Sequence, residues 1–153
     1  MMSVTIREMS ADDCFHVLHH AKTGILACSH EDKPYLVPMS LACEERKIYA
    51  FSLEGKKIAW MRANPQVCVL VQESASRSAW QSVIASGRFE EFPDKDGFTG
   101  ERQHAWSLLQ RKSGWWEPGA IIPEEGTIAK AHEPIFFGIW VEEISGRQGF
   151  ELT

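Results

Sequence analysis

The sequence has no long hydrophobic run and no excess of positive charge. No apolar segment approaches the ~20 residues that a membrane-spanning helix needs. Of 153 residues, 16 are Lys or Arg and 21 are Asp or Glu, so the net charge is −5. Nucleic acids and anionic membranes need a dominant positive field. We therefore expect neither as a main partner. Because MMSVTIREMS does not resemble a signal peptide, we expect a soluble cytoplasmic protein.

The sequence also lacks the patterns of metal and disulfide sites. Its four cysteines contain no CxxC pair, which argues against a zinc knuckle or a redox dithiol and favours free thiols; they are Cys14, Cys28, Cys43 and Cys68. His16 and His20 have the i,i+4 spacing of some metal ligands, but no HExxH glutamate or third ligand accompanies them. We expect an exposed helix face there and no metal.

Motifs of nucleophilic catalysis and of nucleotide-binding loops are missing too. No GxSxG segment occurs, and no GxxxxGK[ST] loop is present. The sequence therefore identifies no catalytic acid, base or nucleophile.

What the sequence does contain is a succession of short strands with a few helices. Ser10, with Asp13 three residues later, predicts the start of a helix that continues to about residue 21. Gly87 marks a bulge or corner in a long strand. The remaining predicted elements are strands at about 24–29, 35–43, 47–52, 66–73, 80–92 and 135–146, and helices at 55–63 and 97–112.

Six strands, most of them joined by connections short enough for hairpins, predict a mainly β fold with α additions. We expect a six-stranded antiparallel split β-barrel with flanking helices, in a single domain that spans residues 1–153. An open barrel of this size has exposed strand edges, and dimerisation is a common way to cover them.

One segment, FSLEGKKIAWMRANP, has an unusual charge pattern. Lys56 and Lys57 stand at the start of a predicted helix, where the helix dipole disfavours cations. A strand end, Gly55 and a helix N-terminus also place unpaired backbone N–H groups together. With the Ser52 hydroxyl, these groups could bind a phosphate dianion. From the pattern alone, two solvated lysines in the first helical turn are the favoured explanation.

Six tryptophans are many for this length and suggest flat binding surfaces. Trp115 and Trp116 lie in a Pro- and Gly-rich predicted loop, where exposed indoles often contact a ligand or a subunit. Simple packing of the loop is the alternative. We include Trp116 among the candidate cofactor contacts.

Taken in order, several segments resemble a known family. They are KPYLVPMSLA, KIYAFSLEGKKIAWMRANPQVCVLV, WQSVIASGRFEEF and FFGIWVEEISGR. Together they resemble the pyridoxamine 5'-phosphate oxidase-like FMN-binding split barrels, and within these the branch of nitroimidazole-resistance and flavin-nucleotide-binding proteins. The resemblance covers roughly residues 6 to 147.

The resemblance implies a homodimer with FMN at the subunit interface. Strand residues Val37, Pro38, Met39 and Ser40 would lie against the isoalloxazine ring, and Ser52, Lys56 and Lys57 would hold the phosphate. Gln81 or Ser82 would reach the flavin from the partner chain. Phe51, also a candidate contact, stands where the nitroimidazole-resistance proteins have a histidine, which argues against transferring their nitro-reductase role. Arg147 matches the substrate-binding basic residues of vitamin B6 oxidases poorly, so we do not expect pyridoxamine phosphate as the substrate.

The resulting hypothesis is an FMN-dependent oxidoreductase, with a small-molecule substrate and NAD(P)H as the reductant. One alternative is a flavin-binding or sensing module without turnover. Another is a haem-binding split barrel, for which an axial ligand would have to come from His30, His104 or His132.

Overall fold

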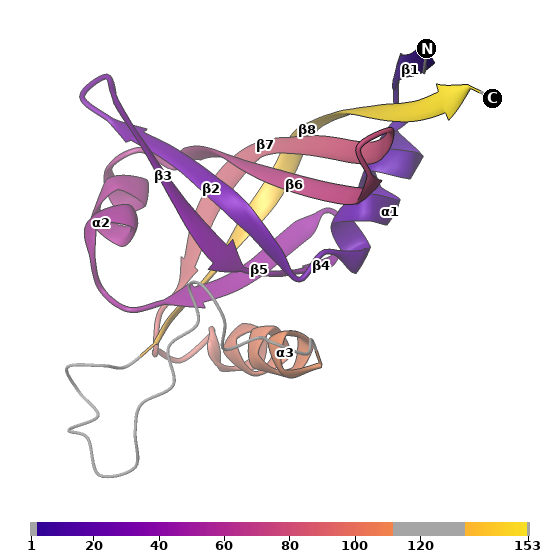
Figure 1. Ribbon diagram of the computed structural model, residues 1–153. Helices are drawn as coiled ribbons and strands as arrows, with labels where there is room; N and C mark the ends of the chain where they lie inside the picture. The colour runs from indigo at the N-terminus through magenta and orange to yellow at the C-terminus, as the bar shows by residue number, and fades with distance from the viewer. Residues whose placement is uncertain (1–2, 112–133, 153) are drawn as a thin grey trace, which may run out of the picture.

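The computed structural model describes residues 3–111 and 134–152 and contains one antiparallel sheet with three helices (Figure 1). The strands are β1 (Ser3–Glu8), β2 (Thr23–His30), β3 (Lys33–Ser40), β4 (Ala42–Glu44), β5 (Lys47–Ser52), β6 (Gln66–Ser76), β7 (Ala79–Phe92) and β8 (Ile135–Leu152). The helices are α1 (Ala11–His20), α2 (Lys56–Ala63) and α3 (Thr99–Gln110).

The strands follow the order β3-β2-β6-β7-β8-β5-β4, and β1 pairs with the C-terminal part of β8. The sheet curls, but within the described residues β3 and β4 do not pair to close it, so the predicted split barrel is confirmed. The strand number is eight rather than six. β1 is missing from the prediction, and the predicted strand 35–43 is divided at Leu41, whose N–H bonds to the Lys22 carbonyl at 2.9 Å.

Local sequence signals account for most element boundaries. The Ser10 hydroxyl accepts a hydrogen bond from the Asp13 N–H at 3.1 Å, which confirms the predicted cap of α1. Glu31 and Asp32 adopt φ angles of 50° and 63°, as a two-residue hairpin turn between β2 and β3 requires. The other predicted hairpin, from β4 to β5, turns at Glu45, with a φ of 54°.

Gly87 is the predicted bulge, because the register of β7 against β8 shifts between Ser86 and Gly87. A Cβ atom at position 87 would lie 1.9 Å from the Trp140 carbonyl oxygen. Only glycine therefore allows the two backbones to approach this closely.

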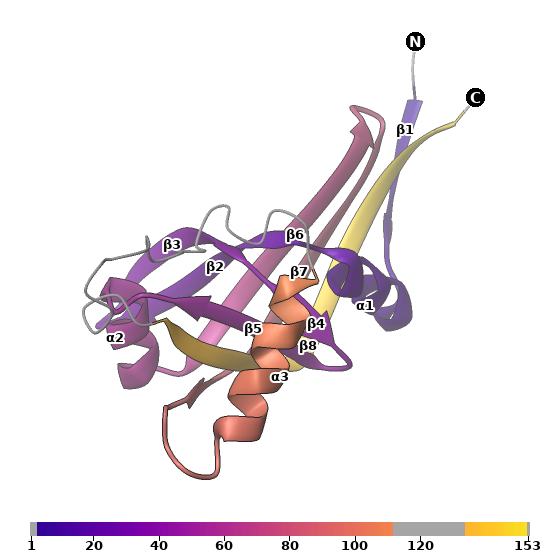
Figure 2. The same cartoon turned by 90° about the horizontal axis from the view of Figure 1, so that it is seen from below.

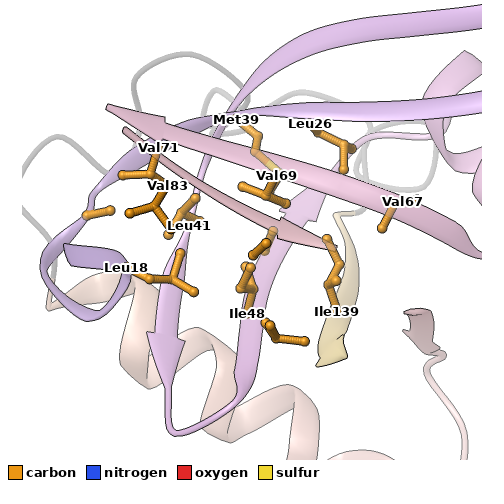
Figure 3. Packing of buried hydrophobic residues seen from close by; sticks show 14 of the residues in the cluster. Leu18, Leu26, Met39, Leu41, Ile48, Val67, Val69, Val71, Val83 and Ile139 are labelled. Carbon is orange, nitrogen blue, oxygen red and sulfur yellow. The ribbon is translucent and has the colours of Figure 1, made fainter. Parts of the chain in front are cut away.

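The main core fills the inside of the curled sheet. Val67, Val69 and Val71 point inward from β6 at every second position and meet Leu18 of α1 and Ile48 of β5 (Figure 3). α1 covers one end of the barrel, and α2 covers the other through Ile58 and Met61, which are both fully buried. The two helices therefore reach the same core from opposite ends.

A second core lies between α3 and the other face of β5 and β8 (Figure 2). Phe51 of β5, Phe136 of β8 and Leu109 of α3 belong to it. Because both faces of β5 are covered, all six of its residues are buried, from Lys47 to Ser52.

The outer face of β7, β6, β2 and β3 has no helix over it in the described part of the chain. Directly paired residues share a face, and the pairing register aligns one row of side chains across four strands: Ile84, Leu70, Ile25 and Pro38. Ile84 is 46% exposed, and Leu36 on the same face is 65% exposed. This uncovered apolar row is a surface suited to another protein chain.

Candidate functional site

The start of α2 is the place where the fold gathers positive charge. β5 ends at Ser52, and three residues later Gly55 forms the N-cap of α2 without any side-chain capping bond. No acidic residue lies in the first turn of the helix, where Lys56 and Lys57 stand instead. An uncapped helix N-terminus presents backbone N–H donors to an anion, and the two ammonium groups add to the same positive potential.

Lys57 is buried although it is charged. The residue is only 9% exposed, but its ammonium nitrogen still reaches solvent, because no side-chain nitrogen of the described residues is both buried and unbonded. Burial lowers the pKa of its ammonium group, and the nearby Cys28 thiol only partly offsets that effect. Within the described residues the Lys57 ammonium makes no ion pair or hydrogen bond. A partly desolvated cation without a counter-charge is unfavourable, so this position is suited to an anion from outside the chain.

Lys56 is exposed, and two aromatic rings hold its ammonium group. Its Nζ lies 4.7 Å from the centroid of the Tyr35 ring and 4.6 Å from that of the Trp60 ring. Such cation–π contacts orient an ammonium group without neutralising it. Both lysines also act electrostatically on the Cys28 thiol, so their charges lie in the same region.

Polar and aromatic contacts fix α2 against the hairpin of β2 and β3. The Asn64 Nδ2 donates to the carbonyl and the hydroxyl oxygen of Ser29, both at 3.2 Å. The Trp60 ring packs against the rings of His30 and Tyr35, with centroids 5.8 and 5.7 Å apart. The helix start that carries the lysines is therefore held in one orientation.

The predicted contacts on β5 point in opposite directions. Ser52 is 5% exposed and faces the barrel interior, where its hydroxyl donates to the Leu53 carbonyl at 3.0 Å. Phe51, 3% exposed, faces the other way and packs against Trp106 and Phe136 beneath α3. Phe51 therefore lies in the second core rather than beside Ser52.

The four predicted contacts on β3 alternate between the two faces of the strand. Met39 is fully buried in the main core, and Val37 is half-buried against it. Pro38 is exposed on the outer face, while Ser40 at the end of the strand is buried. The strand thus presents residues to both the core and the uncovered face.

Gln81 and Ser82 lie far from the lysines. Both belong to β7 where it runs beside β6 and β8 at the end of the molecule opposite α2 (Figures 1 and 2). Ser82 lines a cavity of about 650 Å³ on the outer face, together with Trp80, Ile84 and Arg147. The Gln81 amide instead donates to the Gln148 side-chain oxygen at 3.4 Å. A single chain does not bring these residues to Lys56 and Lys57.

Other sequence predictions meet the structure in different ways. Trp115, Trp116 and His132 lie outside the described residues. The four cysteines are free thiols, as predicted. His20 bonds to the backbone carbonyl of His16, and His19 to that of Glu45, at 2.8 Å each.

Across residues 3–111 and 134–152, no group of three His, Cys, Asp or Glu residues is placed to hold a metal ion. In the same residues, no helix is long and apolar enough to span a membrane.

The sequence reasoning did not identify the aromatic pair around Lys56 or the ion pairs of Arg62. The Arg62 guanidinium bonds to the carboxylates of Glu54 and Glu91. For the aromatic contacts of Lys56, the sequence offered one signal: Lys56 and Trp60 are four residues apart on a helix. The ion pairs of Arg62 depend on how distant segments are placed in the fold.

Comparisons with known proteins find a matching family and several relatives. A profile of the family described as pyridoxamine 5'-phosphate oxidase matches residues 10–148. The uncharacterized protein RA0666 of Rhizobium meliloti (strain 1021) is 42% identical over 142 residues, which are 93% of this chain and 94% of that protein.

Solved structures show the same fold. A FAD-binding protein from Mesorhizobium loti is 40% identical, with a TM-score of 0.78 over 96% of this chain and 98% of the other. A candidate 5-nitroimidazole antibiotic resistance protein from Bacteroides thetaiotaomicron is 16% identical, with a TM-score of 0.69 over 99% and 93% of the two chains. A FAD-binding protein from Mycobacterium smegmatis is 17% identical, with a TM-score of 0.61 over 92% and 98%. The last two share the fold alone.

Proposed function

Because the chain belongs to the pyridoxamine 5'-phosphate oxidase family, we propose that it binds FMN and works as a flavin-dependent oxidoreductase. The observation that carries this proposal is the pair of uncountered ammonium groups at the uncapped start of α2, of which Lys57 is nine-tenths buried. A phosphate monoester carries a charge of −1.5 to −2 near pH 7 and offers three acceptor oxygens. It is the kind of anion that such a site favours.

The residues present fit a flavin phosphate. Lys56 and Lys57 would supply the charge, and the first backbone N–H groups of α2 would donate to the phosphate oxygens. We assign Val37 to Ser40 to the isoalloxazine ring. These residues lie on β3, which pairs with β2, the strand that α2 contacts. When bound, the flavin supplies hydride or electron transfer, while the protein supplies binding, orientation and exclusion of water.

The choice between FMN and FAD rests on what the α2 site needs. Two relatives of the same fold are FAD-binding proteins, and one of them is 40% identical to this chain. FMN ends in a phosphate dianion, whereas each phosphate of FAD carries a single charge. Two lysines without a carboxylate partner favour the dianion, so we propose FMN. Mass spectrometry of the flavin released by heating the purified protein distinguishes the two.

We further propose a homodimer with the flavin site shared between two copies. Gln81 and Ser82 belong to the start of β7, beside the C-terminal part of β8, and Ser82 lines a cavity with Ile84 of the outer face. A second copy packed on this face would cover the row of Ile84, Leu70, Ile25 and Pro38. It would also place its own Ser82 beside the flavin of the first copy. Light scattering of the purified protein measures the assembly.

Turnover separates an oxidoreductase from a module that only binds flavin. Around the lysines the described residues include no carboxylate or histidine bonded to Lys56 or Lys57 that could act as a proton donor or acceptor. We infer that this chain's side chains bind and orient, and that the flavin carries the redox step. Phe51 lies beneath α3, so it offers no group to replace the histidine of the nitroimidazole-resistance proteins.

The first experiment is a visible spectrum. Purified protein is incubated with FMN, separated from free flavin and scanned, and its NADPH oxidation is then followed with quinone and nitroaromatic acceptors. A flavin spectrum with turnover supports the proposal. Stoichiometric flavin without NADH or NADPH oxidation supports a binding module. Protein that stays colourless after incubation with FMN contradicts both.

A further inference from the structure

The loop between β5 and α2 carries an acidic residue beside the lysine site. Glu54 immediately precedes the N-cap Gly55, so only one residue separates it from Lys56. Consecutive Cα atoms are about 3.8 Å apart, which keeps the Glu54 backbone within ~8 Å of the Lys56 backbone. A carboxylate at this position could pair with either lysine, or repel a bound phosphate.

In the structure this carboxylate is held by Arg62 instead. The Arg62 Nη1 bonds to Glu54 Oε1 at 2.6 Å. The same guanidinium bonds to both oxygens of Glu91 on β7, through Nε at 2.6 Å and Nη2 at 3.2 Å. Glu91 is the better buried partner, with its side chain 25% exposed, against 62% for Glu54. Arg62 is therefore anchored to a strand by a two-bond contact and holds a loop side chain with a third donor.

Resting on the proposed phosphate site, we propose that Arg62 is a positioning residue that keeps the Glu54 carboxylate away from Lys56 and Lys57. Arg62 pairs with the Glu54 carboxylate, which the chain places two residues before Lys56. Both lysines are consequently left without an acidic partner in the described part of the chain, and their charge is available to an anion. The Arg62–Glu54 ion pair acts on the electrostatic potential at the helix start and does not contact the flavin.

A purely structural role for these ion pairs predicts something different. Arg62 and Glu54 are exposed, and exposed ion pairs contribute little to stability. Their loss would then change neither folding nor binding, or, if they shape the loop, would weaken binding whether or not Glu54 is charged. The positioning role predicts weaker phosphate binding that depends on the Glu54 charge.

The test compares FMN and riboflavin, which lacks the phosphate, by quenching of flavin fluorescence. The variants are Arg62→Met, Glu54→Gln and the double variant, with Lys95→Met as a control that removes one exposed positive charge elsewhere. We expect Arg62→Met to weaken FMN binding by about three- to tenfold and to leave riboflavin binding unchanged. The double variant should recover wild-type FMN affinity to within about twofold, and Lys95→Met should match wild type.

Salt gives a second readout. Repulsion between Glu54 and the phosphate is screened, so the affinity ratio of wild type to Arg62→Met should shrink toward one in 0.5 M KCl. Thermal melting of each variant checks folding. If Arg62→Met unfolds, Glu54→Gln and Glu54→Lys provide the comparison. We expect both to bind FMN as tightly as wild type or more tightly.

Unchanged FMN binding in Arg62→Met, or a loss that persists in the double variant, overturns the inference and leaves the proposed function intact. If wild type does not bind FMN more tightly than riboflavin, the phosphate site itself is wrong and both proposals fail.

Discussion

Replacing Lys57 by methionine should stabilise the protein and at the same time weaken its binding of FMN. Lys57 is 9% exposed, and its ammonium group, which still reaches solvent, has no counter-charge among the described residues. Methionine keeps most of the apolar length of the side chain, fits irregular gaps and removes the charge. Structural residues are selected for stability, so opposite effects on folding and binding are the mark of a ligand-binding residue.

The size of the stability gain follows from the burial. Replacing a buried ion pair with apolar groups of similar volume is often neutral or stabilising by about 1–4 kcal/mol, and a single lysine should lie in the lower part of that range. Because Lys57 is not wholly enclosed, we expect about 1–2 kcal/mol, which corresponds to a rise in melting temperature of about 2–8 °C for a chain of this length. FMN affinity should fall by more than tenfold, because charge-assisted phosphate bonds are among the strong ones.

The assay is thermal melting of flavin-free protein, followed by titration with FMN. Lys95→Met, which removes an exposed charge, is the matched control and should change neither quantity appreciably. A Lys57→Met protein that melts lower than wild type would show that the ammonium has a favourable partner in the folded chain. Unchanged FMN affinity would show that Lys57 does not hold the phosphate. Either result refutes the reasoning.

Three further predictions concern the same region and the sheet. First, burial lowers the pKa of Lys57 below its ordinary value of 10.5, so the unfolded chain binds more protons between the two pKa values and the stability of flavin-free protein should rise with pH in that interval. The difference between wild type and Lys57→Met in urea melts removes the opposite contribution of Tyr49, whose pKa is raised, and leaves that of Lys57 together with its coupling to Cys28. Second, Gly55→Asp has room for its Cβ, 3.9 Å from the Leu53 carbonyl oxygen, and should raise stability by about 0.5–1 kcal/mol as a cap while weakening FMN binding at least tenfold; equal FMN affinity would argue against the anion position. Third, Gly87→Ala should cost about 2–4 kcal/mol in urea melts, because its Cβ meets the Trp140 carbonyl, whereas Gly100→Ala, with open space around it, should cost much less.

Much of the fold could be predicted from local signals. Capping at Ser10, the turn before Lys33 and the glycine at position 87 each have a local physical cause that the sequence displays. β1 could not be found this way, because five of its six residues are exposed and it is held by pairing with β8 rather than by burial. Pairing between distant segments leaves no pattern in either segment alone.

The position of the two lysines at a helix start could be predicted, but not their surroundings. A glycine followed by two lysines after a strand indicated an anion site at the start of α2. The sequence could not show that Lys57 is buried while Lys56 is exposed, since this depends on how α2 covers the end of the barrel. Nor could it show which way Phe51 points, because α3 covers the outer face of β5 and removes the usual alternation of buried and exposed residues.

The most direct measurement of the central claim is the ratio of FMN to riboflavin affinity in wild type and in the Lys56→Ala, Lys57→Ala double variant. If the start of α2 binds the flavin phosphate, wild type prefers FMN by more than tenfold, and the double variant loses that preference while it stays folded and still binds riboflavin as wild type does. A double variant that keeps the preference for FMN contradicts the account.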